Sequence, residues 1–222
     1  MRVAAIIPAW NEAETIGGVV HVARDAATVD EVIVVDNGST DATARVATAA
    51  GARVVRESEP GKGEAMRAGV AATDAGLIVF LDADLLGLTP QHIDDLVRPV
   101  ARGDVAMACG SFDRGPVANQ FFLRLPVLTG QRALRRELFE ALALSDIKGW
   151  KVEAALNSIV AQRKLARRDM VSCGLWHRTK EQKFDSPVAG FAHKQAMLLT
   201  AVWSYLSFAV KRRLLAPSTP SA

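Results

Sequence analysis

The first 110 residues alternate short runs rich in Val and Ile with longer segments of helical apolar spacing. The short runs are typical of buried parallel strands, and each longer segment begins with polar residues, as helices do. The expected strands are 3–7, 31–35, 53–56, 77–81 and 104–110, and the expected helices are 12–27, 41–50, 64–72 and 90–101. Thr89 and Pro90 are an expected N-cap and first-turn pair for the last of these helices. The alternation predicts an α/β fold with a doubly wound, mostly parallel central sheet.

After residue 110 the pattern loosens. Residues 111–130 contain Gly115, Pro116 and Pro126, which indicate an irregular connection. We then expect helices at 134–142 and 149–164, a strand at 169–173, a polar segment at 177–187 and a final apolar helix at 188–215. A chain of 222 residues fits one α/β domain. We divide it into a first half at 1–110, a second half at 111–187, and a C-terminal helix and tail at 188–222.

Charge is divided unevenly along the chain. The formal net charge of +3 is the sum of −7 over residues 1–123 and +10 over residues 124–222. The basic half could meet an anionic substrate, nucleic acid or an anionic membrane surface, or its charges could be solvated helix faces. Cys109 and Cys173 form no CxxC unit, which excludes a zinc ribbon and a thioredoxin-type pair. We expect both to be buried in a reducing compartment, which favours a cytoplasmic protein.

Neither end of the chain is typical of a membrane-spanning protein. The N-terminal apolar run stops at Pro8 and is interpreted as a strand rather than a signal peptide. The longest uncharged apolar segment, 197–210, has 14 residues, fewer than the roughly 20 that a spanning helix needs. This segment precedes Lys211, Arg212 and Arg213. The last helix could therefore form a homodimer interface, or it could make peripheral membrane contact through its basic end.

Polar segments follow four of the expected strands, at the edge where α/β sheets bind ligands. These segments are PAWNE at 8–12, DNGSTD at 36–41, GKG at 61–63 and DAD at 82–84. In an extended Asp-x-Asp, the carboxylates of Asp82 and Asp84 leave the same side of the backbone and can share one divalent cation. Asp-rich strand ends are also common turn chemistry, so the motif alone does not decide between the two.

Two of the other three polar segments, DNGSTD and GKG, are equally open to alternatives. Asp36 could accept hydrogen bonds from a ribose or a base, or it could form an Asx turn while a residue at 39–41 caps the next helix. The backbone N–H groups around Lys62 could cradle an anion, or GKG could be a surface turn. Two nucleotide signatures, GxxxxGK[ST] and GxGxxG after the first strand, are absent. Their absence disfavours P-loop phosphotransfer and ordinary NAD binding.

Taken together, the segments IIPAWNEAETIGGVV, VIVVDNGSTDAT, GKGEAMRAG and IVFLDADL resemble, in order and spacing, the family 2 glycosyltransferases of GT-A fold. That family transfers sugars from nucleotide sugars. The later segments LTGQRALRRELF, GWKVEAALN and WHRTKEQ are similar to the acceptor loop, sugar-side helix and closing His-Arg segment of glucosyl-3-phosphoglycerate synthases and polyprenyl-phosphate sugar transferases. The resemblance implies a GT-A domain with residues 1–110 as its nucleotide-sugar half, residues 111–187 as its acceptor half, and a C-terminal helical extension.

The resemblance also implies roles for individual residues. The residues expected at the nucleotide are Pro8, Ala9, Glu12, Asp36, Lys62 and Asp82. Those expected at the acceptor are Gly130, Gln131, Arg132 and Arg178. Asp82 and Glu153 are the expected catalytic residues, with Glu153 either binding sugar hydroxyls or acting as a base. Asp84 and His177 are expected to hold Mn²⁺ or Mg²⁺.

We therefore expect a metal-dependent glycosyltransferase that moves a sugar from a nucleotide sugar, a UDP-sugar in particular, to a small phosphorylated or lipid-phosphate acceptor. Nucleic acid is not needed as a partner. One alternative is a sugar-1-phosphate nucleotidyltransferase, although its Gly-rich, basic first turn is missing from PAWNE. The other is a catalytically silent nucleotide-sugar-binding protein. Convergence of Asp84 and His177 would favour the metal-dependent enzyme.

Overall fold

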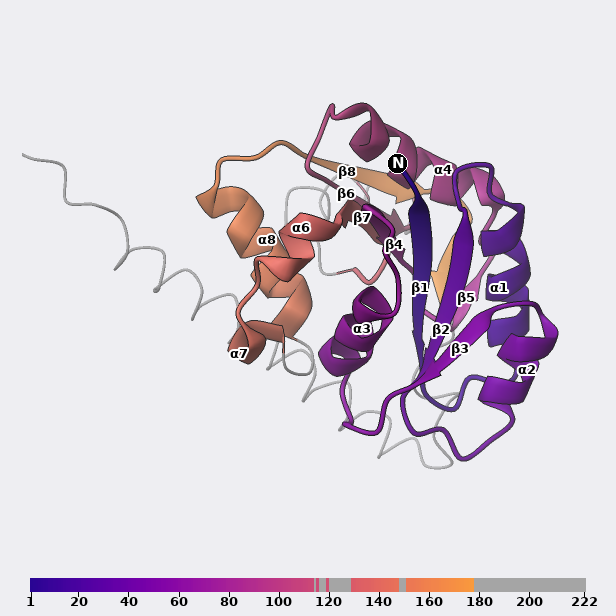
Figure 1. Ribbon diagram of the computed structural model, residues 1–222. Coiled ribbons are helices and arrows are strands. Elements are labelled where there is room, and N and C mark those ends of the chain that lie inside the picture. Colours follow the sequence, from indigo (N-terminus) through magenta and orange to yellow (C-terminus); the bar gives the residue numbers. More distant parts are fainter. Residues whose placement is uncertain (114, 116–118, 120–128, 148–150, 178–222) are drawn as a thin grey trace, which may run out of the picture.

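A computed structural model of the chain describes residues 1–113, 115, 119, 129–147 and 151–177 (Figure 1). Its strands are β1 (Val3–Ala9), β2 (Glu31–Asp36), β3 (Arg53–Arg56), β4 (Leu77–Phe80), β5 (Leu85–Leu86), β6 (Met107–Phe112), β7 (Arg132–Arg135), β8 (Arg167–Ser172) and β9 (Trp176–His177). Its helices are α1 (Ile16–Asp25), α2 (Thr43–Ala49), α3 (Lys62–Ala71), α4 (Pro90–Arg102), α6 (Arg136–Glu140), α7 (Leu144–Ile147) and α8 (Val152–Gln162).

Within these residues, seven strands form one sheet in the order β3-β2-β1-β4-β7-β6-β8. Neighbours β1 to β4 pair in parallel, as do β6 and β8, whereas β7 runs antiparallel to both of its neighbours. The short strands β5 and β9 pair antiparallel in a separate two-stranded sheet. The mostly parallel central sheet predicted from the sequence is confirmed.

Helices cover both faces of the large sheet, giving three layers (Figure 1). Helices α1, α2 and α4 lie on one face, and α3, α6 and α8 lie on the other. Successive residues of β1 point to opposite layers: Ile7 belongs to the core under α1 and α4, and Ile6 belongs to the core under α3 and α8. Both side chains are fully buried, as a parallel strand covered on two faces requires.

The helix predicted at 134–142 is partly wrong. Residues Arg132–Arg135 form β7, and only Arg136–Glu140 continue as helix α6. Because β7 lies between β4 and β6 and is covered on both faces, Arg132, Ala133 and Leu134 are all buried and show no polar alternation. Local periodicity therefore could not distinguish this strand from the helix that follows it.

Helix α4 begins as predicted. Thr89 is its N-cap, and the Thr89 side chain accepts a hydrogen bond from the backbone N–H of His92 at 3.3 Å, with Pro90 in the first turn. Elsewhere, burial is confirmed for Cys109, but Cys173 is exposed, so the expectation for the second cysteine is wrong. Cys173 lies between the end of β8 and β9, in a turn rather than in the sheet.

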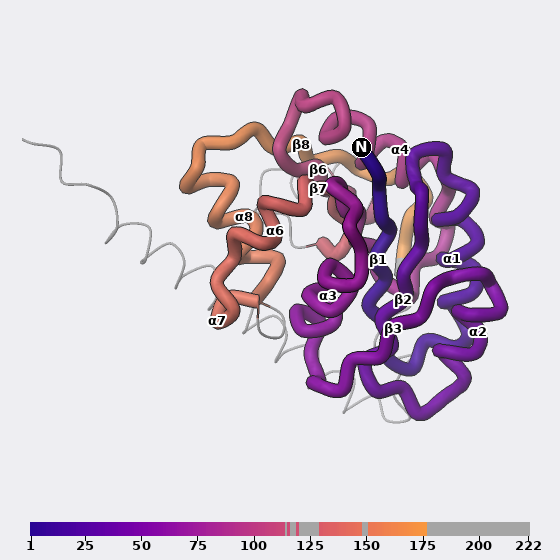
Figure 2. Tube along the Cα trace, viewed as in Figure 1, coloured from indigo at the N-terminus to yellow at the C-terminus, as the bar shows by residue number. Residues whose placement is uncertain are grey.

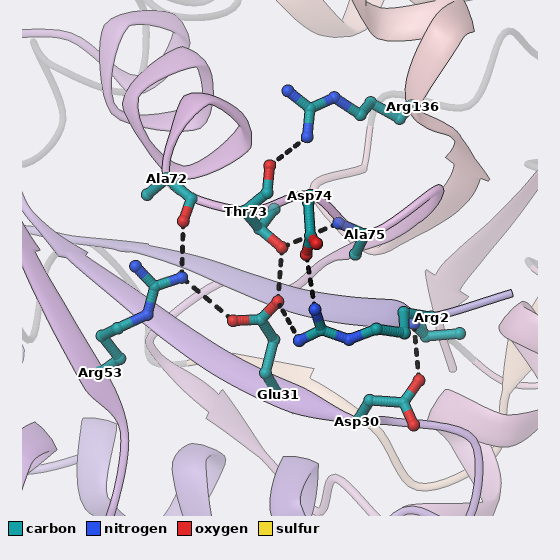
Figure 3. Close-up of polar contacts among 10 residues, drawn as sticks. Arg2, Asp30, Glu31, Arg53, Ala72, Thr73, Asp74, Ala75 and Arg136 are labelled. Atoms are coloured by element: carbon teal, nitrogen blue, oxygen red, sulfur yellow. Dashed lines mark hydrogen bonds and ion pairs between the residues drawn. The ribbon is translucent and has the colours of Figure 1, made fainter.

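The amino ends of the first strands are tied together by a cluster around Glu31 (Figure 3). The Glu31 carboxylate lies 3.2 Å from Arg2 Nη2 and 3.0 Å from Arg53 Nη2, and it also accepts a hydrogen bond from the Thr73 hydroxyl. Arg53 Nη2 donates to the carbonyl oxygen of Ala72 at 2.6 Å. The contacts join the starts of β1, β2 and β3 to the segment after α3. The carboxyl ends of the same strands, at the other edge, carry the polar segments predicted to bind a ligand.

Three expectations fall wholly or largely outside the described residues. They are the irregular connection at 111–130, the polar segment after His177, and the final helix at 188–215 with its homodimer and membrane alternatives. Among the residues that are described, no helix has both the length and the apolar character needed to cross a membrane.

Candidate functional site

The ends of β1 and β2 bring two of the expected nucleotide-binding segments together. Ala9 pairs with Asp36 in the parallel register, and Pro8 pairs with Val35. The backbone N–H of Glu12 donates to Thr43 Oγ1 at 2.8 Å, so the turn after β1 lies against the start of α2. The sequence prediction that PAWNE and DNGSTD share one edge is therefore confirmed, although no contact identifies a ligand.

Asn11 joins these two turns, a role that the sequence interpretation missed. Its backbone lies in the left-handed region with φ of 54°, which Asn tolerates better than most residues. The Asn11 N–H donates to Ser39 Oγ at 3.0 Å, and the Thr40 N–H donates to Asn11 Oδ1 at 2.8 Å. Asn immediately after a buried strand was the available signal, because this residue type combines tolerance of positive φ with side-chain hydrogen bonding.

Asp41 strengthens the same junction. Its carboxylate accepts hydrogen bonds from the backbone N–H of Thr43 at 2.9 Å and of Ala13 at 3.1 Å. Burial on its own would raise the pKa of Asp41, but the hydrogen bonds from Thr43 and Ala13 outweigh it and lower the pKa below its ordinary value. The turn after β2 is thereby held in one conformation beside the end of β1.

Asp36 holds the turn that follows it, but not as an Asx turn. The residue is 7% exposed, and its carboxylate accepts a hydrogen bond from the Ser39 N–H, three residues on, at 3.1 Å, whereas an Asx turn uses the N–H two residues on. The neighbouring Asn37 extends the junction to the next loop: its Oδ1 accepts from the Gly61 N–H at 2.8 Å, and its Nδ2 donates to the Glu59 carbonyl at 2.7 Å. Because Gly61 donates its N–H to Asn37, the structure does not support an anion cradle that uses this group.

Lys62 is the centre of the site. Its Nζ lies 2.8 Å from Asp82 Oδ1 and 2.7 Å from Glu153 Oε1, and the exposed fractions of the three side chains are 14%, 25% and 11%. Burial on its own would lower the pKa of Lys62, but the negative charges of Asp82 and Glu153 outweigh it and raise the pKa well above its ordinary value. The ammonium group therefore stays charged, and the three side chains together carry one net negative charge.

Small residues allow the three charged groups to meet. A Cβ atom on Gly63 would lie 1.5 Å from the carbonyl oxygen of Ile147, so the backbones of α3 and α7 are in direct contact. Figure 2 shows α3 beside α7 and α8 on the same side of the sheet. Gly61, which precedes α3, has φ of 146°. The glycines on both sides of Lys62 thus permit the close approach that brings Lys62 to Glu153.

The loop before β7 contributes Gly130 and Gln131, both expected at an acceptor. A Cβ atom on Gly130 would lie 2.0 Å from Asp82 Oδ1, so this backbone is seated against the carboxylate. Gln131 is 1% exposed, and its Nε2 donates to Asp82 Oδ2 at 2.7 Å. The structure brings both residues to the site. It places Gln131 behind Asp82, where direct contact with an acceptor is not supported.

Arg132, also expected at the acceptor, is fully buried. Its Nε and Nη2 donate to the carbonyl oxygen of Thr129 at 3.1 and 2.6 Å, and its Nη1 donates to the carbonyl oxygen of Glu153 at 3.3 Å. The guanidinium therefore joins the loop before β7 to the first turn of α8. This environment argues against contact with an acceptor phosphate. The fourth acceptor residue predicted from the sequence, Arg178, lies outside the described residues.

Asp84 and His177 are brought together through the backbone. Asp84 directly precedes β5, and β5 pairs with β9 so that Leu85 lies opposite His177. The geometry assumed for DAD is wrong, because Ala83 and Asp84 form a turn rather than an extended segment. Carboxylate and imidazole together suit Mn²⁺ or Mg²⁺, with a slight preference for Mn²⁺. No three His, Cys, Asp or Glu side chains of the described residues gather to hold an ion by themselves.

The family follows from a match over most of the chain. A family model described as glycosyl transferase family 2 matches residues 4–146. The chain belongs to glycosyltransferase family 2. The family predicted from the sequence segments is therefore confirmed, and with it the interpretation of the strand-end motifs as those of a glycosyltransferase rather than of a P-loop or NAD-binding protein.

Two kinds of curated relatives match this family 2 chain. Glucosyl-3-phosphoglycerate synthase from Mycolicibacterium smegmatis is 40% identical over 125 residues, covering 52% of this chain and 41% of that protein. An uncharacterized glycosyltransferase from Mycobacterium tuberculosis is 31% identical over 189 residues, covering 76% of this chain and 84% of that protein. The chain thus spans about two fifths of the synthases that it matches.

Solved structures of the synthase extend the similarity to most of the chain. The crystal structure of glucosyl-3-phosphoglycerate synthase from Mycobacterium tuberculosis in complex with Mn²⁺, UDP-glucose and phosphoglyceric acid has a TM-score of 0.75 and 29% identity, covering 93% of this chain and 79% of that chain. The same enzyme in complex with Mg²⁺ and UDP also gives a TM-score of 0.75 at 29% identity. Those proteins bind a divalent metal, a uridine nucleotide and a phosphorylated three-carbon acid.

Proposed function

We propose that this family 2 member is a metal-dependent glycosyltransferase that moves a sugar from a UDP-sugar to a small phosphorylated acceptor. The observation that carries the proposal is the pairing of β5 with β9, which brings His177 beside the turn that contains Asp84. That turn follows β4 at the carboxyl edge of the sheet, where the ends of β1 and β2 also meet.

The donor set at this edge fits a divalent metal, with Asp84 and His177 as its protein ligands. Two protein ligands leave coordination positions for the oxygens of a diphosphate. When bound, the metal would offset the negative charge that grows on the nucleoside diphosphate as the sugar leaves. The absence of a larger acidic cluster among the described residues fits this arrangement, because an ion held by two side chains depends on the nucleotide to complete its site.

Lys62 lies at the same edge, but its positive charge is offset locally. Asp82 and Glu153 hold its ammonium group from two sides, at 2.8 and 2.7 Å, and the three side chains together carry one net negative charge. The bound metal, rather than Lys62, would therefore offset the charge that develops on the diphosphate, while Lys62 fixes the positions of Asp82 and Glu153 in the partly buried site. Because Glu153 Oε1 binds the Lys62 ammonium group, we favour sugar binding over proton abstraction for this residue.

For the nucleotide, we propose that the uridine side of the donor lies over Pro8, Ala9, Glu12 and Asp36, the ends of β1 and β2. The turn that holds Asp36 is joined to two neighbouring loops, because Ser39 Oγ accepts from the Asn11 N–H and Asn37 Oδ1 accepts from the Gly61 N–H. The solved synthase structures are consistent with a uridine donor, since their complexes contain UDP or UDP-glucose. We propose UDP-glucose as the first donor to test and 3-phosphoglycerate as the first acceptor, with a lipid phosphate as the alternative acceptor.

The test is release of UDP from UDP-glucose in the presence of Mn²⁺, Mg²⁺ or a chelator, with 3-phosphoglycerate or a polyprenyl phosphate as acceptor. Mass spectrometry of the acceptor identifies the glycosylated product. We expect acceptor-dependent UDP release that requires the metal and is lost in Asp84→Asn. Asp104→Asn is the matched control, because it makes the same change at an exposed position away from the site and should keep the wild-type rate.

Two outcomes would contradict the proposal. Full activity of Asp84→Asn would exclude Asp84 as a metal ligand. Metal-dependent UDP binding without transfer to either class of acceptor, and with no glycosylated product from a wider acceptor panel, would favour the catalytically silent nucleotide-sugar-binding alternative. Formation of a nucleotide sugar from UTP and a sugar 1-phosphate would favour the nucleotidyltransferase alternative instead.

A further inference from the structure

Gln131 is a buried polar residue, and its side chain contacts Asp82 and Thr129 rather than solvent. It precedes β7 and is 1% exposed. At one end its side chain donates from Nε2 to Asp82 Oδ2 at 2.7 Å. At the other end its Oε1 is in hydrogen-bond contact with the hydroxyl of Thr129. The nitrogen and the oxygen of the Gln131 amide are therefore both in contact with neighbouring side chains, Asp82 and Thr129.

Thr129 anchors this arrangement to the sheet. It is 4% exposed, and its single hydroxyl proton can be donated either to the carbonyl oxygen of Gly110 in β6, 2.7 Å away, or to Gln131 Oε1, while the hydroxyl oxygen accepts from the Gln131 N–H at 3.2 Å. The backbone N–H of Gly110 in turn donates to the carbonyl oxygen of Gln131 at 2.9 Å. The Gln131 side chain is thus fixed from behind by β6, and its amide nitrogen points at Asp82.

Asp82 is consequently held from two sides. Lys62 Nζ binds Oδ1 and Gln131 Nε2 binds Oδ2, while the Gly130 backbone packs against the carboxylate group. The charged groups that meet here come from separate elements: Lys62, which binds Asp82, comes from α3, and Glu153, which binds the same Lys62, comes from α8. If Gln131 were removed, Asp82 would lose the contact that sets the rotation of its carboxylate and the direction from which it binds Lys62.

We propose that Gln131 is a positioning residue for the transfer reaction, which fixes the Asp82 carboxylate and through it the Lys62 ammonium group. This role rests on the proposed function and replaces the direct acceptor contact expected from the sequence. The amide is required at this position, because a carboxylate of the same shape would lack the donor and would face Asp82 with a like charge.

The kinetic test uses Gln131→Met, which keeps the length of the side chain but removes its donor. A lost hydrogen bond to a charged group corresponds to a fall in kcat of about tenfold or more. We expect this fall with little change in the KM of the acceptor, because Gln131 acts through Asp82. The control is Gln162→Met on the exposed face of α8, which should match wild type. Two results would overturn the proposal. A raised acceptor KM with unchanged kcat would favour direct contact between Gln131 and the acceptor, and no change in either constant would show that Gln131 serves only in packing.

A second test needs no substrate. Gln131→Glu should lower the melting temperature by opposing two carboxylates, and Asp82→Asn should lower it by removing the partner of Lys62. In the double variant the donor and acceptor are exchanged, so its melting temperature should exceed that of Gln131→Glu alone. A double variant whose losses simply add would overturn the Gln131–Asp82 contact. If the wild-type protein showed no turnover, the proposed function would be contradicted. The comparison of the two single variants with the double variant would still show whether Gln131 contacts Asp82.

Discussion

Replacing Lys62 with Met tests whether the site is organised around one buried cation. The substitution keeps an unbranched side chain that is one atom shorter, and it leaves Asp82 and Glu153 facing each other without a counter-charge. Removing one partner of a buried ion pair costs about 3 to 5 kcal/mol of unfolding free energy. Asp82 is a quarter exposed and keeps its bond to Gln131, so solvent screening reduces the expected loss to about 2 to 3 kcal/mol.

The pH dependence of this loss follows from the sign of the Lys62 pKa shift. The pKa of Lys62 is raised in the folded state. The ammonium group therefore makes its full contribution to the unfolding free energy below the unfolded pKa of 10.5, and this contribution is lost only as the pH rises through the higher folded pKa. The deficit of Lys62→Met should therefore be constant around neutral pH.

The assay is urea unfolding of wild type, Lys62→Met and Lys151→Met at several pH values around neutral, all below the unfolded lysine pKa. Lys151 is the matched control, because it is an exposed lysine next to α8, and its substitution should change the unfolding free energy by less than about 0.5 kcal/mol. A Lys62→Met deficit as small as that of the control would refute the reasoning. So would a deficit that changes strongly over this pH range, because the raised pKa keeps the Lys62 ammonium group charged throughout it.

Three further substitutions test the elements that support the site. Gly63→Ala should lower the melting temperature, because its Cβ would lie 1.5 Å from the Ile147 carbonyl oxygen. The control Gly18→Ala in α1, whose Cβ would meet nothing within 4 Å, should raise the unfolding free energy by about 0.5 to 1 kcal/mol. Equal effects of the two substitutions in thermal melts would count against the contact between Gly63 and Ile147. Thr89→Ala should cost about 1 kcal/mol in urea unfolding through loss of the α4 N-cap, and a neutral result would contradict that cap. Asp41→Asn should be destabilising near neutral pH. Because the pKa of Asp41 is lowered in the folded state, its carboxylate stabilises the fold above the unfolded pKa, and this contribution is lost as the pH falls through the folded pKa. A difference in melting temperature between wild type and Asp41→Asn that does not shrink in acid would contradict this.

The first half of the fold, residues 1–110, was largely predictable from the sequence. Its strands are short runs rich in Val and Ile, and strand β3 was predicted with its observed bounds, 53–56. Parallel topology also fixes that strand ends meet at one edge, so Ala9 and Asp36 could be placed together from their positions alone. Local sequence and a general topological rule were sufficient for this part.

The second half depends on contacts that local sequence does not contain. Strand β7 becomes a strand because β4 and β6 pair with it, and its residues 132–134 are buried on both faces. Burial of Arg132 depends on carbonyl oxygens of Thr129 and Glu153, which folding brings to it from two other segments. Nothing in LTGQRALRRELF distinguishes this arginine from Arg135, which lies three residues further on in the same strand.

The site was predictable in its membership more than in its geometry. Lys62, Asp82 and Glu153 were each expected at the site, but their convergence on one ammonium group required the contact between α3 and α7 at Gly63. Gln131 was likewise expected at the site, yet its direction toward Asp82 depends on Thr129 and β6. Motifs identify residue types, whereas orientation is decided by packing between segments distant in sequence.

Calorimetric titration of UDP tests the central claim most directly, that the carboxyl edge of this sheet is a metal-dependent nucleotide-sugar site. Wild type and Asp84→Asn would each be titrated with UDP in the presence of Mn²⁺ and in the presence of a chelator. We predict measurable binding only for wild type with Mn²⁺, because Asp84 and His177 are the proposed ligands of the ion that would meet the diphosphate. Binding of equal affinity in the chelator, or in Asp84→Asn with Mn²⁺, would contradict the claim.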